Sequence, residues 1–171
     1  IGILTGGGDC PGLNAVIRAV AKTAINVYGI EVYGLLDGFS GLVLDKIIPL
    51  RFDDVSSILT QGGTILGTSN RDNYFNVKRN ESQRVIPGQN KIKTALRNFK
   101  KHRLDGLITV GGDGTLTVGN YLHEQGIPVI GVPKTIDNDV MHTDQTFGFD
   151  SAAWIAGFAV DRLHSTAASH Q

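Results

Sequence analysis

The chain has 171 residues, of which 41% are hydrophobic and 19% charged, a composition that supports one compact domain and excludes an intrinsically disordered chain. Sixteen basic residues balance sixteen acidic ones, so the overall charge provides no broad electropositive surface for nucleic acid or for an anionic membrane. A single cysteine, Cys10, excludes an internal disulfide and favours a reducing, cytoplasmic location, and no apolar run reaches the length of a membrane span.

The first part of the chain is predicted to form strand, turn, helix and strand. Residues 1–5 are a short apolar run that predicts a buried strand. A helix should begin near Gly12 and end at Gly29, and a second strand should occupy residues 30–36. Residues 53–60 predict a short helix. The helix after Gly12 should bury one face, formed by Leu13, Val16, Ile17, Val20 and Ala24.

The second part alternates regularly between helices and strands. Strands are predicted at residues 107–110 and 128–132, with a helix between them that ends at Gly126, whereas the polar residues 70–89 predict a surface loop. This repetition predicts an α/β fold, a single domain with a Rossmann-like, mostly parallel sheet and helices on both faces. Apolar spacing indicates two further helices. The first has Ile92, Ala95, Leu96 and Phe99 on one face, and the last carries Trp154, Ile155, Phe158 and Leu163. Trp154 and Phe158 are interpreted as core residues.

Three loops should lie at the carboxyl edge of this sheet, where open parallel sheets bind ligands. The first, GGGDCPG at residues 6–12, has glycines that let backbone N–H groups approach a phosphate at the start of a helix. Pro11 breaks the dinucleotide pattern GxGxxG, and Leu13 replaces the lysine of a P-loop. Taken alone, this loop fits a phosphate cradle and a plain strand-to-helix turn equally well.

The second loop, GGDGT at residues 111–115, holds a carboxylate among glycines. Asp113 suits Mg²⁺, which takes one or two carboxylates together with phosphate oxygens. The alternative is that Asp113 only caps the following helix. Glycine on both sides of Asp113 favours the metal and phosphate role, because a cap does not require it.

The third loop, PKTIDND at residues 133–139, follows the next strand. Phosphoryl transfer to an alcohol needs a group that accepts the hydroxyl proton, and Asp137 can act as this base. Asp139 would hold the loop or help to place substrate or metal, and Lys134 supplies positive charge where anions meet. An Asx-rich turn without catalysis is the alternative explanation for the same residues.

These loops, taken with three further segments, resemble the phosphofructokinases. GGDGT alone also occurs in NAD kinases and diacylglycerol kinases, but its combination with PKTIDND is highly specific. The resemblance covers essentially the whole chain in the family's order. The matching segments are GGGDCPGLNAVIRAV at 6–20, GGT-LGTS at 62–69, GGDGT at 111–115, PKTIDND at 133–139, DQTFGFDSA at 144–152 and DRLHSTAASHQ at 161–171.

The resemblance implies an enzyme of two α/β lobes, with residues 1–171 as the N-terminal, donor-binding lobe, truncated at both ends. It implies Mg²⁺-dependent transfer of a phosphoryl group from ATP to the 1-hydroxyl of fructose 6-phosphate, which gives fructose 1,6-bisphosphate in glycolysis. It also implies a homo-oligomer for the full-length protein, because family members are commonly dimers or tetramers, and the sequence does not choose between these two. Further sugar-binding residues of the family follow Gln171, so the chain alone is expected to be inactive.

Motif positions in the family imply roles for individual residues. The donor site would comprise Gly8, Gly112, Asp113, Gly114 and Thr115, with Asp113 engaging Mg²⁺. The sugar phosphate would contact Thr135, Ile136 and Asp137, with Asp137 as the base and Asp139 as a second carboxylate near the reacting phosphate. Arg71, which stands in GTSNR where many relatives read GTSR, would neutralise the transferred phosphate.

Two residues are informative about the donor. Gly114 favours ATP, because a side chain there would fill the space of the α-phosphate, whereas Lys134 is shared with relatives that use pyrophosphate. ATP is the favoured donor and pyrophosphate the alternative. Two rival functions are an NAD kinase-like or lipid kinase-like enzyme, which PKTIDND opposes, and an inactive regulatory subunit, which the intact Asp113 and Asp137 oppose.

Overall fold

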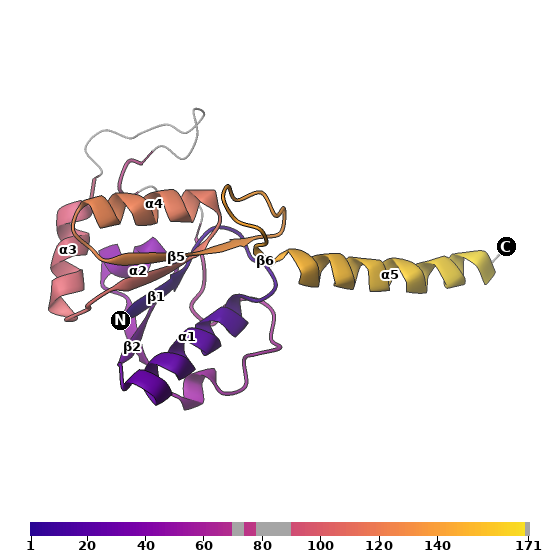
Figure 1. Cartoon of the computed structure of the whole chain (residues 1–171), viewed down its shortest axis with the longest axis horizontal. Coiled ribbons are helices and arrows are strands. Elements are labelled where there is room, and N and C mark those ends of the chain that lie inside the picture. Colours follow the sequence, from indigo (N-terminus) through magenta and orange to yellow (C-terminus); the bar gives the residue numbers. More distant parts are fainter. Residues whose placement is uncertain (70–73, 78–89, 170–171) are drawn as a thin grey trace.

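A six-stranded sheet with the order β3-β2-β1-β4-β5-β6 forms the centre of the computed structural model, which describes residues 1–69, 74–77 and 90–169 (Figure 1). All neighbouring strands pair in parallel except β3, which is antiparallel to β2. This arrangement confirms the predicted α/β fold with a mostly parallel sheet. The strands are β1 (Gly2–Thr5), β2 (Val32–Leu35), β3 (Ile47–Leu50), β4 (Leu107–Gly111), β5 (Val129–Thr135) and β6 (Phe147–Gly148).

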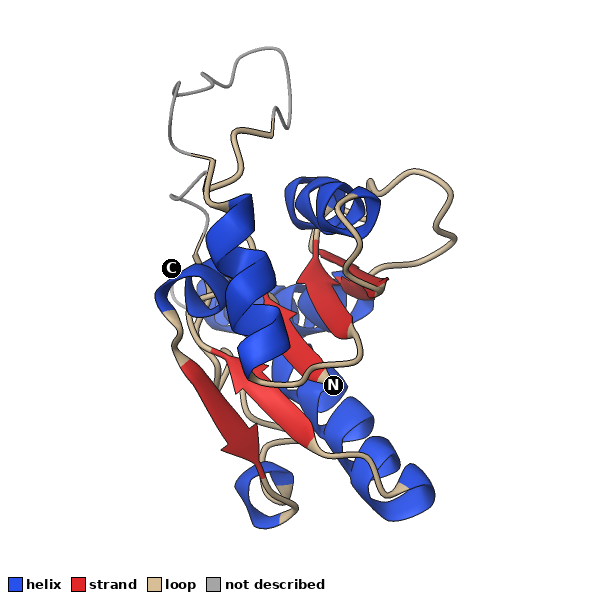
Figure 2. Cartoon of the chain, turned by 90° about the vertical axis from the view of Figure 1, so that its left-hand side faces the viewer, coloured by secondary structure: helices blue, strands red, loops and turns tan. Residues whose placement is uncertain are grey.

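Helices cover both faces of this sheet (Figure 2). One face packs against α2 (Phe39–Leu44), α3 (Ile92–Lys101) and α4 (Asp113–Glu124), and the other against α1 (Leu13–Tyr28) and the short 3₁₀ helix η1 (Asp53–Val55). Successive side chains of a strand point to opposite faces, so Leu4 joins the first core cluster and its neighbour Ile3 the second.

The sequence located α1 correctly, because both of its ends are marked by glycines in left-handed conformations. Gly12 has a φ of 97° and Gly29 a φ of 63°, values that residues with a side chain rarely adopt. Other boundaries differ from the prediction. Residues 53–60 contain only one 3₁₀ turn, and β5 extends to Thr135 because Lys134 and Thr135 pair with β6. The elements α2, β3 and β6 were not predicted.

Helix α5 (Phe149–Ser169) projects away from the body of the molecule (Figure 1). None of its described side chains is buried, and Trp154 is 68% exposed. The interpretation of Trp154 and Phe158 as core is therefore wrong for this chain: their rings stack with centroids 5.4 Å apart, but no other described element covers them. None of the described helices combines the length and hydropathy needed to cross a bilayer.

Candidate functional site

The three motif loops leave the sheet side by side, at the carboxyl ends of β1, β4 and β5. Strand β1 lies between β2 and β4. The strands that follow β1 in the chain, β2 and β3, lie on one side of it, and β4 to β6 lie on the other, so the strand order reverses between β1 and β4. Open α/β sheets bind ligands at such a switch point. The ends of the strands are level, because Thr5 pairs with Val110 and Gly111 pairs with Pro133. Three segments far apart in the sequence are thus brought to one edge.

Two side chains from other segments hold the first loop by its backbone. The Thr68 hydroxyl donates a hydrogen bond of 2.7 Å to the Gly7 carbonyl, and the Lys134 ammonium donates one of 2.6 Å to the Gly8 carbonyl. Lys134 is 4% exposed although Gly8 itself lies at the surface. A lysine from β5 therefore reaches beneath the first loop and contacts it from the interior.

The charge of Lys134 is not neutralised by a partner within the described residues. Its ammonium forms no ion pair with any described carboxylate. Burial lowers the pKa of Lys134 from its ordinary value, and the nearby Cys10 and Asp9 oppose this effect. A buried ammonium of this kind is stabilised by an anion, so the loop is suited to bind one.

The second loop packs closely against the other two. A Cβ on Gly111 would lie 2.4 Å from Thr115 Oγ1, and a Cβ on Gly6 would lie 2.6 Å from the same atom, so the buried Thr115 side chain fills the space between these glycines. A Cβ on Gly112 would lie 3.3 Å from the carbonyl oxygen of Lys134. Glycine thus allows the backbones of the three loops to approach one another.

The start of α4 presents a carboxylate. Gly112 is the N-cap residue, and Asp113, the first residue of the helix, is exposed. The described residues contain no group of three or more His, Cys, Asp or Glu side chains able to hold a metal. The single carboxylate of Asp113 nevertheless fits Mg²⁺, which binds through one or two carboxylates plus substrate phosphates and water.

The third loop is a turn fixed by hydrogen bonds on both sides of Asp137. The Asp137 N–H donates to Thr135 Oγ1 at 3.2 Å. Asn138, in a left-handed conformation with a φ of 54°, accepts the backbone N–H of Thr146 at 2.9 Å through its Oδ1. The Thr146 hydroxyl in turn donates to the Thr135 carbonyl at 2.8 Å. The carboxylates of Asp137 and Asp139 are left exposed.

Cys10, a residue of the first loop, is buried and contacts β6. Its Sγ lies 3.6 Å from the carbonyl oxygen of Phe147. Burial raises the pKa of the thiol above its ordinary value, and the charge of Lys134 opposes this in part. The protonated thiol is therefore the favoured form at neutral pH.

The residues named from the sequence lie in three places. Gly8 is in the first loop; Gly112, Asp113, Gly114 and Thr115 form the start of α4; Lys134 and Thr135 end β5, and Ile136, Asp137 and Asp139 follow it. Arg71 lies outside the described residues. Sequence reasoning missed Thr68, Asn138 and Thr146 as residues that hold these loops. Thr68 and Asn138 stand within the GTS and PKTIDND segments, which was the available signal.

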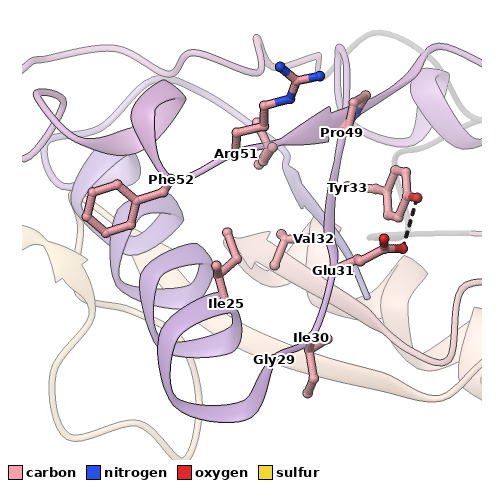
Figure 3. A pocket seen from close by; sticks show the side chains of 10 residues that line it. Ile25, Gly29, Ile30, Glu31, Val32, Tyr33, Pro49, Arg51 and Phe52 are labelled. Atoms are coloured by element: carbon pink, nitrogen blue, oxygen red, sulfur yellow. Dashed lines mark hydrogen bonds between the residues drawn. The ribbon is translucent and has the colours of Figure 1, made fainter.

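A cavity of about 470 Å³ lies at the opposite end of the sheet (Figure 3). Its lining comes from the end of α1, the start of β2 and the end of β3, and includes Ile25, Val32, Leu50 and Phe52. At its rim the Tyr33 hydroxyl donates to Glu31 Oε2 at 3.3 Å. Since β2 begins here and the motif loops lie where β1 and β4 end, this cavity is separate from the candidate site.

Comparisons with known proteins identify the family of the chain. The family model described as phosphofructokinase matches residues 1–171. The ATP-dependent 6-phosphofructokinase 2 of Clostridium perfringens is 52% identical over 170 residues, which cover 99% of this chain and 46% of that relative. A pyrophosphate–fructose 6-phosphate 1-phosphotransferase of Amycolatopsis mediterranei is 49% identical, with 99% of this chain and 46% of that relative covered.

Solved structures show the same fold. The phosphofructokinase of Saccharomyces cerevisiae superposes with a TM-score of 0.82 at 31% identity, over 99% of this chain and 24% of that chain. The Pichia pastoris phosphofructokinase in the T-state gives a TM-score of 0.73 at 33% identity, over 86% of this chain and 16% of that chain. The chain spans about half the length of the curated relatives it matches.

Proposed function

The chain belongs to the phosphofructokinase family, and we propose that it supplies the donor-binding lobe and the catalytic base of a 6-phosphofructokinase. The reaction is transfer of a phosphoryl group from ATP to the 1-hydroxyl of fructose 6-phosphate. Residues 1–171 form one α/β unit in this proposal, and the full-length enzyme acts as a cytoplasmic homo-oligomer. The Clostridium perfringens relative, which is named as an ATP-dependent 6-phosphofructokinase, supports this activity.

The observation that carries the proposal is the hydrogen bond from Lys134 to the Gly8 carbonyl. It joins the loop after β1 to the end of β5, two residues before Ile136 and three before Asp137. A polyphosphate on the first loop would therefore lie beside the loop that carries the carboxylate. Such positioning is the main requirement of phosphoryl transfer, in which the protein forms no covalent bond with the substrate.

The residues of the chain would divide the work as follows. Backbone N–H groups around Gly8 and the N-terminal end of α4 would bind the donor phosphates. Thr135 and Ile136 would contact the sugar phosphate. The exposed Asp137 carboxylate would accept the proton of the sugar 1-hydroxyl while the hydroxyl oxygen bonds to the terminal phosphorus of ATP and the bond from that phosphorus to the oxygen of the departing ADP breaks. Asp139 would help to place the reacting groups, and Arg71 would neutralise the transferred phosphate.

Asp113 would hold Mg²⁺ together with the donor phosphates. The bound ion would neutralise negative charge on the oxygens of the transferred group. Thr115 occupies a different position from Asp113, because its side chain is buried against Gly6 and Gly111. Its contribution to the donor site is therefore to keep the two glycine loops in contact.

Pyrophosphate is the second candidate donor, and two observations favour it. The buried ammonium of Lys134 lies beside Gly7 and Gly8, where its positive charge would offset part of the negative charge of a pyrophosphate bound to the first loop. A relative of 49% identity is named as a pyrophosphate-dependent enzyme. Gly114 favours ATP, because the absence of a side chain leaves room for the nucleotide part of the donor. ATP therefore remains the first choice.

A coupled assay of fructose 1,6-bisphosphate formation by the full-length protein tests the proposal. We expect activity with ATP that exceeds activity with pyrophosphate, and a loss of about 10²- to 10⁴-fold in kcat for Asp137→Asn. Asp105→Asn, an exposed change at the amino end of β4, is the matched control and should leave kcat unchanged. Near-normal turnover by Asp137→Asn would show that Asp137 is not the catalytic base. Nucleotide binding without turnover in the wild type would favour a regulatory subunit.

A further inference from the structure

We propose that Thr68 is a positioning residue that acts with Lys134 to hold the first glycine loop ready for the donor's phosphates. The inference rests on the proposed function, since it identifies how the donor site of that enzyme is prepared. Thr68 comes from the segment after η1 and Lys134 from β5, so two distant parts of the chain hold one loop. Their targets are the carbonyls of consecutive residues, Gly7 and Gly8.

The geometry of the peptide bond links these contacts to anion binding. In a planar trans peptide the N–H points away from the carbonyl of the same unit. When Thr68 holds the Gly7 carbonyl, the Gly8 N–H therefore points to the opposite side, and when Lys134 holds the Gly8 carbonyl, the same is true of the Asp9 N–H. Neither N–H donates to another described residue, and both residues are exposed. The loop thus offers two free donors to a ligand.

Without these contacts, no other hydrogen bond within the described residues would fix the orientation of the Gly7–Gly8 and Gly8–Asp9 peptide units. Gly7 has a φ of 82° and glycine has the widest choice of backbone conformations, so each peptide unit could rotate. A rotation of the Gly7–Gly8 unit would turn a carbonyl oxygen toward the bound phosphate and repel it. The Thr68 hydroxyl, half-buried at a hydrogen-bond distance of 2.7 Å, disfavours this rotation.

Thr68 offers a cleaner test than Lys134 because it is uncharged. Loss of Lys134 removes positive charge as well as a hydrogen bond, so weaker donor binding would have two explanations. Thr68→Val removes only the hydroxyl and keeps the branched shape. Thr68→Ser restores the hydroxyl, and Thr23→Val, at an exposed position on α1, is a control for the exchange itself.

The experiment measures binding of ATP and of pyrophosphate to the full-length protein by calorimetry, together with KM and kcat for each substrate. We expect Thr68→Val to raise the dissociation constant of the donor about fivefold to tenfold, as for the loss of one net hydrogen bond. The KM for fructose 6-phosphate at saturating donor should be unchanged, and Thr68→Ser should restore donor binding. Lys134→Met combined with Thr68→Val should weaken binding by less than the product of the single effects, since both residues hold the same loop.

The outcomes separate this inference from the proposed function. Wild type that binds neither donor would remove the proposed function itself. The inference about Thr68 would be overturned if Thr68→Val bound the donor as tightly as the wild type does. It would also be overturned if Thr68→Val raised the KM of the donor and the KM of fructose 6-phosphate equally. Should Thr68→Val fail to fold, Thr68→Ala and Thr68→Ser are compared in its place, and equal donor affinity of these two would equally overturn it.

Discussion

The thiol of Cys10 fills the space beside the α-carbon of Gly148, where a Cβ would lie only 1.9 Å from the sulfur atom. Cys10 belongs to the first glycine loop, and Gly148 is the last residue of β6, directly before α5. Gly148 also has a φ of 105°, outside the range of residues with a side chain. This contact joins the first loop to β6 and depends on glycine for two separate reasons.

Replacing Gly148 by alanine should therefore strongly destabilise the protein. We expect Gly148→Ala to lower the free energy of unfolding by about 2 kcal/mol or more, from backbone strain and from the clash with Cys10. Chemical denaturation of the full-length protein measures this. Gly106→Ala is the control, because a Cβ there makes an ordinary contact of 3.6 Å with the Pro128 carbonyl. Equal stability of the two variants would contradict the prediction.

The contact between Gly6 and Thr115 predicts a compensating pair of substitutions. All three near contacts of a Cβ on Gly6 are with the Thr115 side chain, so Gly6→Ala should cost about 1–3 kcal/mol and Thr115→Ala should recover part of it in the double variant. Gly111→Ala should be recovered less well, because its Cβ would also lie 2.8 Å from the Gly6 carbonyl oxygen. Additive effects in both double variants, measured by thermal unfolding, would argue against this packing.

Asn138 should affect turnover through the position of Asp137. Both Asn138→Ala and Asn138→Gly remove the acceptor of the Thr146 N–H, and a shift of the adjacent Asp137 should lower kcat about 10- to 100-fold. Asn138→Gly should be the more stable of the two, because glycine tolerates the φ of 54°. Steady-state kinetics and unfolding measure the two effects separately. A normal kcat in a destabilised Asn138→Ala would restrict this side chain to a structural role.

Asp45 predicts a pH dependence of stability. Hydrogen bonds from Lys101 and then His102 lower the pKa of this carboxyl below its ordinary value of 3.8, and His102 Nε2 lies 2.6 Å from Asp45 Oδ1. A lowered folded-state pKa means that the stabilisation is present above the unfolded-state pKa and is lost as the pH falls through the folded-state value. Asp45→Asn should therefore lower the midpoint of thermal unfolding at pH 7.

The same variant should match the wild type at a pH below the lowered folded-state pKa of Asp45, where this carboxyl is protonated in both the folded and the unfolded state. Lys101→Met removes one partner of Asp45 and should show a smaller decrease with the same pH dependence. Thermal unfolding monitored across the acid range provides the comparison. A difference between Asp45→Asn and wild type that persists at low pH would show that the charge of Asp45 is not the source of the effect.

The elements that the sequence predicted well have strong local signals. Helix α1 has an apolar face and a left-handed glycine at each end, and β1 and β4 are short apolar runs. The elements it missed depend on partners. Strand β6 has two residues and exists through pairing with β5, and α2 has six residues, too few to reveal a helical period. The error about Trp154 and Phe158 has the same origin, because a helical pattern shows which side chains are apolar but not what covers them.

The sequence by itself determined the α/β class, the three loops and the family, because glycines, carboxylates and their order are properties of the linear chain. Only the tertiary structure decided which groups meet. That Thr68 and Lys134 contact Gly7 and Gly8, and that Thr115 fills the space between Gly6 and Gly111, follows from the strand order and register of the sheet. Such contacts join residues up to 126 positions apart, and no local pattern encodes a hydrogen bond over that separation.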